Sequence, residues 1–286
     1  MALGFSASSD WAFDRITGSA GKRILMSCAS WGRRLELTET PIYSIIPQVF
    51  SQKTGSRFLD MAVYSNTHQF IFVHVPKNAG STLIMNYRKK VAPDFLLGFE
   101  ELNAELGYER DPALGNHFTY QMIKSLCDRH AVPIDYQNYF KFCVVRNPFE
   151  RMVSLYQHRL RKIDATTNGV PRNSPEDKAL LKKGFEAWLL TTQNVSDRVL
   201  TKMSQLDWIK DEAGAIVCDR VIDVRNYDQE IMETLETLRM PRIELDKFNV
   251  SAKDSSQYKS YYTASTRAHI EKYFAEDLDV LKYSFS

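Results

Sequence analysis

Two short apolar runs, each followed at once by a turn and a helical pattern, constrain the fold of this 286-residue chain more than any other feature. The first run covers residues 70–75 (FIFVHV) and the second covers residues 140–145 (FKFCVV). Both are rich in β-branched and aromatic residues and are short, which favours buried strands over helices. A less regular third run lies within residues 215–224. Strands that alternate with helices predict an α/β fold, with a P-loop-like, mostly parallel central sheet flanked by helices.

The composition is that of an ordinary globular protein. Hydrophobic residues make up 44% of the chain and charged residues 25%, which excludes disordered and collagen-like proteins. The 37 basic and 35 acidic residues leave a net charge of +2, which is too small for a general nucleic-acid binder. No apolar run approaches the roughly 20 residues that span a bilayer, and Asp10 and Asp14 interrupt any signal-peptide core. We therefore predict a cytoplasmic protein without a membrane span.

The sequence divides into two parts. Residues 1–65 have weak hydrophobic periodicity and scattered Gly and Pro, and we predict that they form an N-terminal extension packed on the main domain. The main domain is predicted to cover residues 66–286. Within it, the polar stretch 161–177 contains Asn, Gly and two Pro, and it is predicted to form a long surface loop.

The segment after the first strand has the features of an anion site. It reads PKNAGST over residues 76–82 and leads into an amphipathic helix. The small residues Ala79 and Gly80 allow a tight turn, and the backbone N–H groups of residues 79–82 are expected to point outward at the positive end of the helix dipole. Lys77 adds a mobile positive charge. Because this lysine precedes the glycine, the segment is not a Walker A loop, in which the lysine follows it.

The second strand is followed by a second candidate anion site. Arg146 comes directly after the strand, where its guanidinium can clamp a phosphate. Asn147 and Pro148 are typical of a helix start, and Glu150 completes a predicted capping box. Two anion sites at neighbouring strand ends suit a nucleotide that carries phosphate at both its 5′ and 3′ positions.

These segments resemble motifs of the carbohydrate sulfotransferase family. Residues 74–82 resemble its 5′-phosphosulfate loop, H-x-P-K-x-x-G-[ST]-[ST], and residues 146–156 resemble its 3′-phosphate motif, R-x-P-x-x-R-x-x-S-x-Y. The likeness extends over about residues 68–286 and is to the membrane-type members, the group that includes heparan 2-O- and chondroitin-type enzymes. Because no membrane anchor is found, the chain is more similar to a soluble, bacterial-type member.

The resemblance implies a sulfotransferase that moves a sulfuryl group in line from 3′-phosphoadenosine 5′-phosphosulfate to a hydroxyl of a glycan or glycolipid, with adenosine 3′,5′-bisphosphate as the product. It implies that Lys77 is catalytic and neutralises charge on the leaving phosphate, and that no metal ion takes part. Sulfuryl transfer depends mainly on positioning and charge stabilisation, which agrees with these residue types. The donor-binding residues that it implies are Lys77, Asn78, Ala79, Gly80, Ser81, Thr82, Arg146 and Ser154.

The acceptor hydroxyl must lose a proton, and histidine is a suitable general base near neutral pH. His117 lies in the segment GNHFTY, which resembles the H-x-x-[YF] stretch that holds the proposed base of the family. We therefore predict that His117 is catalytic, with a purely structural role as the alternative. His74 is the second candidate, although its place in the first strand indicates that it braces the loop.

Other functions fit part of the sequence. A P-loop kinase-like phosphotransferase explains the strand, loop and helix, but it needs a Ser or Thr directly after the loop lysine to hold magnesium, where Asn78 stands. A non-catalytic nucleotide-binding module would tolerate the loss of His117. Sulfation of a small hydroxylated metabolite is an alternative to sulfation of a glycan.

The local charge distribution bears on the acceptor. Residues 70–93 hold four basic and no acidic residues (+4), and residues 146–164 hold five basic and two acidic ones (5 − 2 = +3). Residues 94–111 hold one basic and six acidic residues (1 − 6 = −5). Positive charge thus lies at the two candidate phosphate sites and is cancelled elsewhere, which favours a neutral or weakly acidic glycan over a heavily sulfated polymer. From their position, segments 94–116 and 161–177 are predicted to form the acceptor surface.

Overall fold

The structure is a computed structural model in which the chain forms two compact units, Met1–Arg57 and Phe58–Ser286. In the first unit it describes the backbone of three strands. In the second unit it describes residues 62–65, 68–90, 97–98, 114, 117–130, 135, 137–167, 170–171, 173–246 and 255–285. The N-terminal strands form an antiparallel sheet in the order β1-β2-β3, which the sequence analysis did not predict: β1 Trp11–Gly18, β2 Gly21–Cys28 and β3 Arg33–Leu37.

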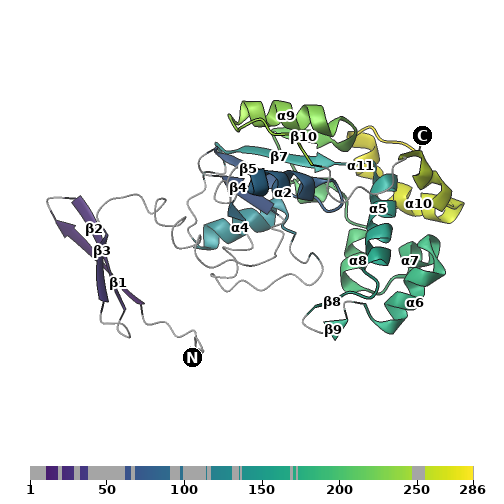
Figure 1. Ribbon diagram of the computed structural model, residues 1–286, viewed down its shortest axis with the longest axis horizontal. Coiled ribbons are helices and arrows are strands. Elements are labelled where there is room, and N and C mark those ends of the chain that lie inside the picture. Colours follow the sequence, from purple (N-terminus) through teal and green to yellow (C-terminus); the bar gives the residue numbers. More distant parts are fainter. Residues whose placement is uncertain are drawn as a thin grey trace. The chain divides into compact units, whose positions relative to one another are not determined.

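The second unit is built on a five-stranded sheet in the order β10-β7-β5-β4-β6 (Figure 1). β7 pairs in parallel with both β5 and β10, whereas β4 is antiparallel to both of its neighbours. Four of these five strands therefore run in the same direction, which confirms the predicted mostly parallel α/β sheet. The strands are β4 Ala62–Ser65, β5 Phe70–Val73, β6 Leu97–Gly98, β7 Phe140–Val145 and β10 Arg220–Asp223.

The position of β4 changes the predicted boundary between the two parts. The sequence analysis assigned residues 62–65 to the extension, but they form a strand of the central sheet, and the second unit begins at Phe58 rather than at residue 66. The predicted packing of the extension on the main domain stays a prediction.

The described helices alternate with these strands along the chain, as the sequence pattern predicted. No helix in the described part of the chain combines the length and apolarity needed to cross a membrane. The helices are α2 Gly80–Lys90, α4 Tyr120–His130, α5 Pro148–Arg161, α6 Pro175–Lys183, α7 Phe185–Thr191, α8 Val195–Leu200, α9 Tyr227–Thr237, α10 Ala264–Tyr273 and α11 Ala275–Val280.

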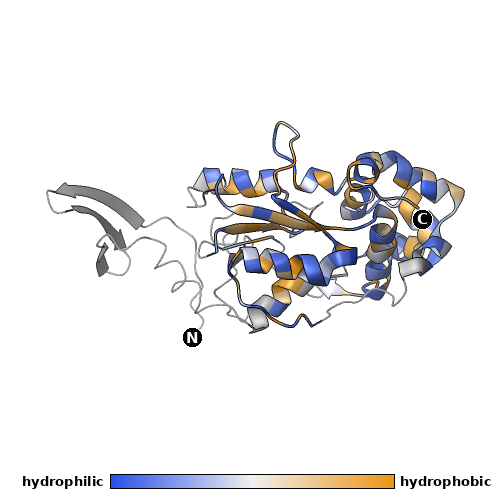
Figure 2. Ribbon diagram, turned by 90° about the horizontal axis from the view of Figure 1, so that it is seen from above, coloured by the Kyte–Doolittle hydropathy of each residue, from blue (hydrophilic) through white to orange (hydrophobic). Residues whose placement is uncertain are grey.

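Each face of the sheet contributes to its own hydrophobic cluster. Because successive strand residues point to opposite faces, Phe70 and Phe72 pack with residues of α2 and α9, whereas Ile71 and Val73 pack with residues of α4, α5 and α10. Figure 2 shows the apolar strands lying between helices that are hydrophilic on their outer sides. The sheet is therefore covered on both faces, and its strand ends are the natural place for a site.

The stretch 161–177 is not one long loop. After α5 the chain forms a short hairpin from β8 Thr166–Thr167 and β9 Val170–Pro171, and α6 then begins at Pro175. Ser174 caps α6 in a capping box with Asp177, and Pro175 occupies the first helical turn. Ser-Pro-Glu-Asp is a helix-start signal, and the polar composition of the stretch concealed it.

Candidate functional site

The loop between β5 and α2 has an unusual backbone. Lys77 and Ala79 both adopt positive φ angles, of 71° and 65°, while the residue between them does not. Alternation of this kind turns successive backbone N–H groups toward one side and forms an anion-binding concavity. Positive φ is costly for residues other than glycine, so the surrounding structure must hold the loop in place.

Two buried side chains hold the loop from inside. Asn78 is fully buried, and its Nδ2 donates to the Val144 carbonyl (2.9 Å) and to Gln205 Oε1 (2.7 Å). The Arg151 guanidinium, also buried, donates from Nε to the Pro76 carbonyl at 3.1 Å. The Asn78 side chain is thus turned into the protein, so any contribution that Asn78 makes to the concavity comes from its backbone.

The first turn of α2 departs from the expected set of outward N–H groups. The Thr82 N–H donates to the Ala79 carbonyl at 2.9 Å, so it is used within the turn. Gly80 is required for space and not for a positive φ. A Cβ built on Gly80 would lie 2.5 Å from His74 Cδ2 and 2.8 Å from Phe72 Cζ, closer than real Cβ atoms approach other atoms. The start of α2 therefore packs directly against the His74 ring.

His74 and His117 form a stacked pair beneath this loop. Their ring centroids lie 5.2 Å apart with an interplanar angle of 28°, and His117 also makes an edge contact with Trp208. Burial and the Lys77 charge lower the pKa of His74 to about 4, and burial followed by His74 lowers the pKa of His117 well below its ordinary value. Both imidazoles are therefore neutral at pH 7. β5 ends at Val73, so His74 lies after the strand and not within it.

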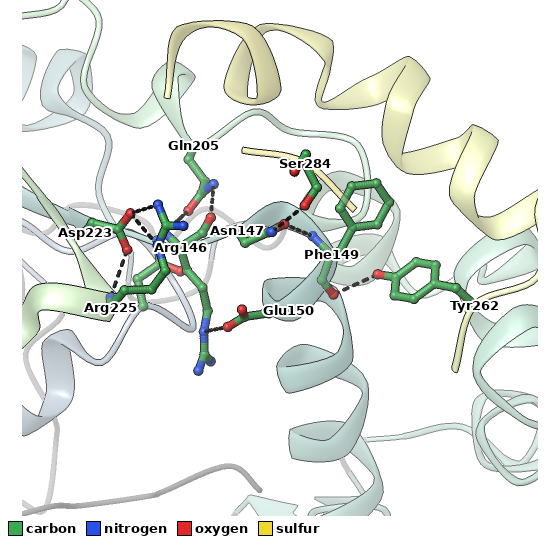
Figure 3. A network of polar contacts seen from close by, with 10 residues as sticks. Arg146, Asn147, Phe149, Glu150, Gln205, Asp223, Arg225, Tyr262 and Ser284 are labelled. Carbon is green, nitrogen blue, oxygen red and sulfur yellow. Dashed lines mark hydrogen bonds and ion pairs between the residues drawn. The ribbon is translucent and has the colours of Figure 1, made fainter. Parts of the chain in front are cut away.

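The second candidate anion site lies beside the first because of the strand register. Val73 pairs with Cys143 in the parallel β5–β7 ladder, so the residues that follow β5 and β7 leave the same edge of the sheet. Arg146 stands at the end of β7, and its Nε donates to Glu150 Oε2 at 3.2 Å (Figure 3). Ser154 is buried two turns along α5. Lys77 and Arg146 are thus brought together at one edge, as the sequence predicted.

The start of α5 forms as predicted in part. Asn147 caps the helix by accepting from the Phe149 N–H at 3.1 Å, and Pro148 lies in the first turn. The prediction of a capping box is wrong, because the Glu150 carboxylate binds the Arg146 guanidinium instead of the Asn147 backbone N–H. Asn147 also donates to the Ser284 carbonyl at 2.9 Å, which ties the last described residues to this site (Figure 3).

Several cationic side chains lie close enough to affect one another at this site. Burial, followed by the repulsion of four cations, lowers the pKa of Lys77 to about 8; the cations are Arg161, Arg159, Lys162 and Arg146. Burial, followed by Lys77 and the cations of α5, lowers the pKa of His158 to about 3. Cations that repel one another across a half-buried space favour the binding of an anion, which relieves their repulsion.

The end of β10 adds a third polar group at the same edge. Asp223 accepts from the Arg225 backbone N–H at 2.8 Å and from its Nε at 2.9 Å (Figure 3). The Arg225 guanidinium lies over the Tyr283 ring, 5.0 Å from its centroid. The parallel strands β5, β7 and β10 are thus each followed within four residues by a cationic side chain, namely Lys77, Arg146 and Arg225.

Some predicted features fall outside the described residues or are not tested by them. Most of segment 94–116, predicted to contribute to the acceptor surface, lies outside the described residues. Among the described residues no group of three or more His, Cys, Asp or Glu side chains is placed to hold a metal ion. Sequence reasoning assigned no role to Gln205, which stands in no motif, or to Asp277, and both are fully buried behind the two loops.

The fold and site together define a class: an α/β protein with paired candidate phosphate sites at the ends of adjacent parallel strands. A sequence profile described as the sulfotransferase family matches residues 60–284. The chain therefore belongs to the sulfotransferase family and is a sulfotransferase. No curated protein and no solved structure gives a significant match.

Proposed function

We propose that this enzyme transfers the sulfuryl group of 3′-phosphoadenosine 5′-phosphosulfate to a hydroxyl of a neutral or weakly acidic glycan or glycolipid, in the cytoplasm. One observation carries the proposal: the β5–β7 register sets the Lys77 loop and Arg146 side by side at one edge of the sheet. Two adjacent anion sites match a nucleotide that has anionic groups at both the 5′ and the 3′ position.

The residues present fit such a donor. The alternating backbone of the Lys77 loop offers N–H groups to the 5′ phosphosulfate. Residues 77–82 form the proposed cradle, in which the Thr82 N–H is used within the turn. Arg146 and Ser154 are proposed to hold the 3′-phosphate, where a planar guanidinium can bind two phosphate oxygens at once. Because Arg146 is already paired with Glu150, the 3′-phosphate must either share the Arg146 guanidinium with that carboxylate or displace it.

The donor supplies an activated sulfuryl group whose bond to the 5′-phosphate breaks during transfer. Lys77 places its ammonium beside the oxygen that receives the electron pair, and it stabilises the charge that develops there. His117 accepts the proton of the acceptor hydroxyl as the new oxygen–sulfur bond forms. A base must be neutral to act, and the lowered pKa of His117 keeps it so at pH 7.

The site disfavours the kinase alternative. A P-loop kinase holds magnesium with a hydroxyl directly after its loop lysine, and here that position is Asn78, whose side chain is buried and bonded to Val144 and Gln205. No matching observation favours a non-catalytic module.

The proposal is tested by transfer of radiolabelled sulfate from the donor to a panel of desulfated glycans, glycolipids and small hydroxylated compounds. We expect label on a glycan or glycolipid, and loss of transfer in Lys77→Ala. Lys124→Ala is the matched control, because Lys124 lies on α4 and pairs with Asp128 at 3.2 Å. Label only on small compounds would overturn the acceptor class, and wild-type transfer by Lys77→Ala would overturn the role of the loop.

A further inference from the structure

We infer that Gln205 is a positioning residue that fixes the spacing between the two anion sites, and thereby the preference for a nucleotide phosphorylated at both ends. This inference rests on the proposed function. Gln205 lies just before a short helical turn, Leu206–Trp208, and its side chain reaches the 5′ loop and the end of β7 at the same time. Its side chain bonds the Asn78 side chain and the Arg146 backbone, and not the side chains proposed to hold the phosphates.

The Gln205 amide uses all of its hydrogen-bonding capacity on this bridge. Its Oε1 accepts from Asn78 Nδ2 at 2.7 Å and from the Arg146 backbone N–H at 3.0 Å. Its Nε2 donates to the Arg146 carbonyl at 2.7 Å and to Asp277 Oδ2 at 3.2 Å. An amide has two acceptor lone pairs and two N–H donors, so the side chain has one orientation that satisfies all four bonds. Figure 3 shows the Gln205 side chain bonded to the backbone of Arg146.

Asp277 fixes Gln205 from behind. This α11 carboxylate is fully buried, and it accepts from the backbone N–H groups of Gln205 (2.9 Å) and Leu206 (3.2 Å) and from the Ser204 hydroxyl. It therefore ties α11, near the end of the chain, to the segment that carries Gln205. Because the whole chain of bonds from Asp277 to Asn78 is buried, water does not compete with it.

Fixed spacing matters because a ligand that binds two sites at once gains affinity only if both sites are held at the correct separation. Asn78 determines the position of the strained 5′ loop, and the Arg146 backbone determines where the 3′ clamp begins. Loss of the bridge lets the two loops move independently. The affinity for each phosphate taken alone then changes little, while the advantage of a doubly phosphorylated ligand decreases.

The test compares the affinities of adenosine 3′,5′-bisphosphate, adenosine 5′-monophosphate and adenosine 3′-monophosphate, measured by calorimetry with the full chain. In Gln205→Leu we expect the advantage of the bisphosphate over the better monophosphate to decrease about tenfold or more, with each monophosphate affinity changed less than about threefold. Thr234→Val is the control, because the Thr234 side chain is fully buried in α9 and its hydroxyl donates to the Glu230 carbonyl at 2.7 Å, away from both loops. It should lower thermal stability and leave the advantage unchanged.

Each result has one reading. An unchanged advantage in Gln205→Leu, with the wild type showing one, overturns the inference and leaves the proposed function standing. A wild type without any advantage for the bisphosphate overturns both. An equal loss for all three ligands also overturns the inference, because it indicates general damage to the site. If Gln205→Leu does not fold, Gln205→Asn, which keeps the amide but shortens its reach, is measured in the same way.

Discussion

Replacement of Gly80 by alanine probes the contact between the start of α2 and the histidine pair. The added Cβ would lie 2.5 Å from His74 Cδ2, 2.8 Å from His74 Nε2 and 2.8 Å from Phe72 Cζ. Carbon atoms in contact are normally about 3.5–4.0 Å apart, so the atoms must separate by about 1 Å. Neither neighbour has room to move, because His74 is stacked on His117 and Phe72 is packed on Phe142 with centroids 5.0 Å apart.

The expected cost follows from this lack of room. Overpacking a rigid core costs about 1–3 kcal/mol, so we expect Gly80→Ala to lower the free energy of unfolding by about 2 kcal/mol and the urea midpoint by roughly 1 M. If the loop moves instead, a displacement of about 1 Å at the Lys77 loop should lower kcat/KM by roughly a hundredfold. Urea unfolding and labelled-sulfate transfer measure the two effects.

A second glycine provides the control for this prediction. Gly214 has a φ of +81° and no atom within 4 Å of a built Cβ, so Gly214→Ala adds backbone strain without a steric clash. It should cost roughly 1 kcal/mol and leave the transfer rate unchanged. Wild-type stability and wild-type transfer in Gly80→Ala would refute the reasoning, since they would show that the His74 ring does not fix the position of α2.

Three further predictions concern the site. Since the pKa of Lys77 is lowered to about 8, its ammonium loses its proton above pH 8, so the KM for the donor should rise with pH beyond that value; a flat profile up to pH 10 would contradict this. His117→Ala should lower kcat about 10²–10⁴-fold without weakening the binding of adenosine 3′,5′-bisphosphate, whereas the control His269→Ala should leave kcat unchanged. Because the pKa of His117 is lowered well below 6.5, wild-type activity should not fall near pH 6.5 on acidification. Asn147→Ala removes the cap of α5 and the bond to the Ser284 carbonyl, and it should reduce the free energy of unfolding by about 1–2 kcal/mol in urea; an unchanged midpoint would show that neither bond is stabilising.

Local patterns in the sequence were sufficient to predict the framework. β7 covers residues 140–145 as predicted, because a short β-branched and aromatic run bounded by turn residues has few other stable arrangements. The helix start at Asn147 and Pro148 was also predicted from local residue types, because Asn is a common helix cap and Pro is favoured in the first helical turn. Lys77 and Arg146 could be placed at one edge because parallel strands bring their carboxyl ends together.

The supports of the site could not be predicted, because they depend on contacts distant in sequence. Gln205 stands in no recognisable pattern, and the roles of Gln205 and Asp277 appear only once α11 packs behind the strand ends. Arg151 belongs to the segment that resembles the 3′-phosphate motif, but its side chain is buried and donates to the Pro76 carbonyl instead. Gly80 was predicted to allow a tight turn, but the His74 and Phe72 rings, and not the backbone angle, are what exclude a larger residue there.

The central claim is that the Lys77 loop and Arg146 together bind a nucleotide phosphorylated at both ends. The most direct measurement is the thermal shift of the wild type with adenosine 3′,5′-bisphosphate, compared with ATP and magnesium. At a hundredfold excess over its Kd, the bisphosphate should raise the Tm by roughly 5–10 °C, and Lys77→Ala and Arg146→Ala should each reduce that shift. Stabilisation by ATP with magnesium alone, with none by the bisphosphate, would contradict the claim.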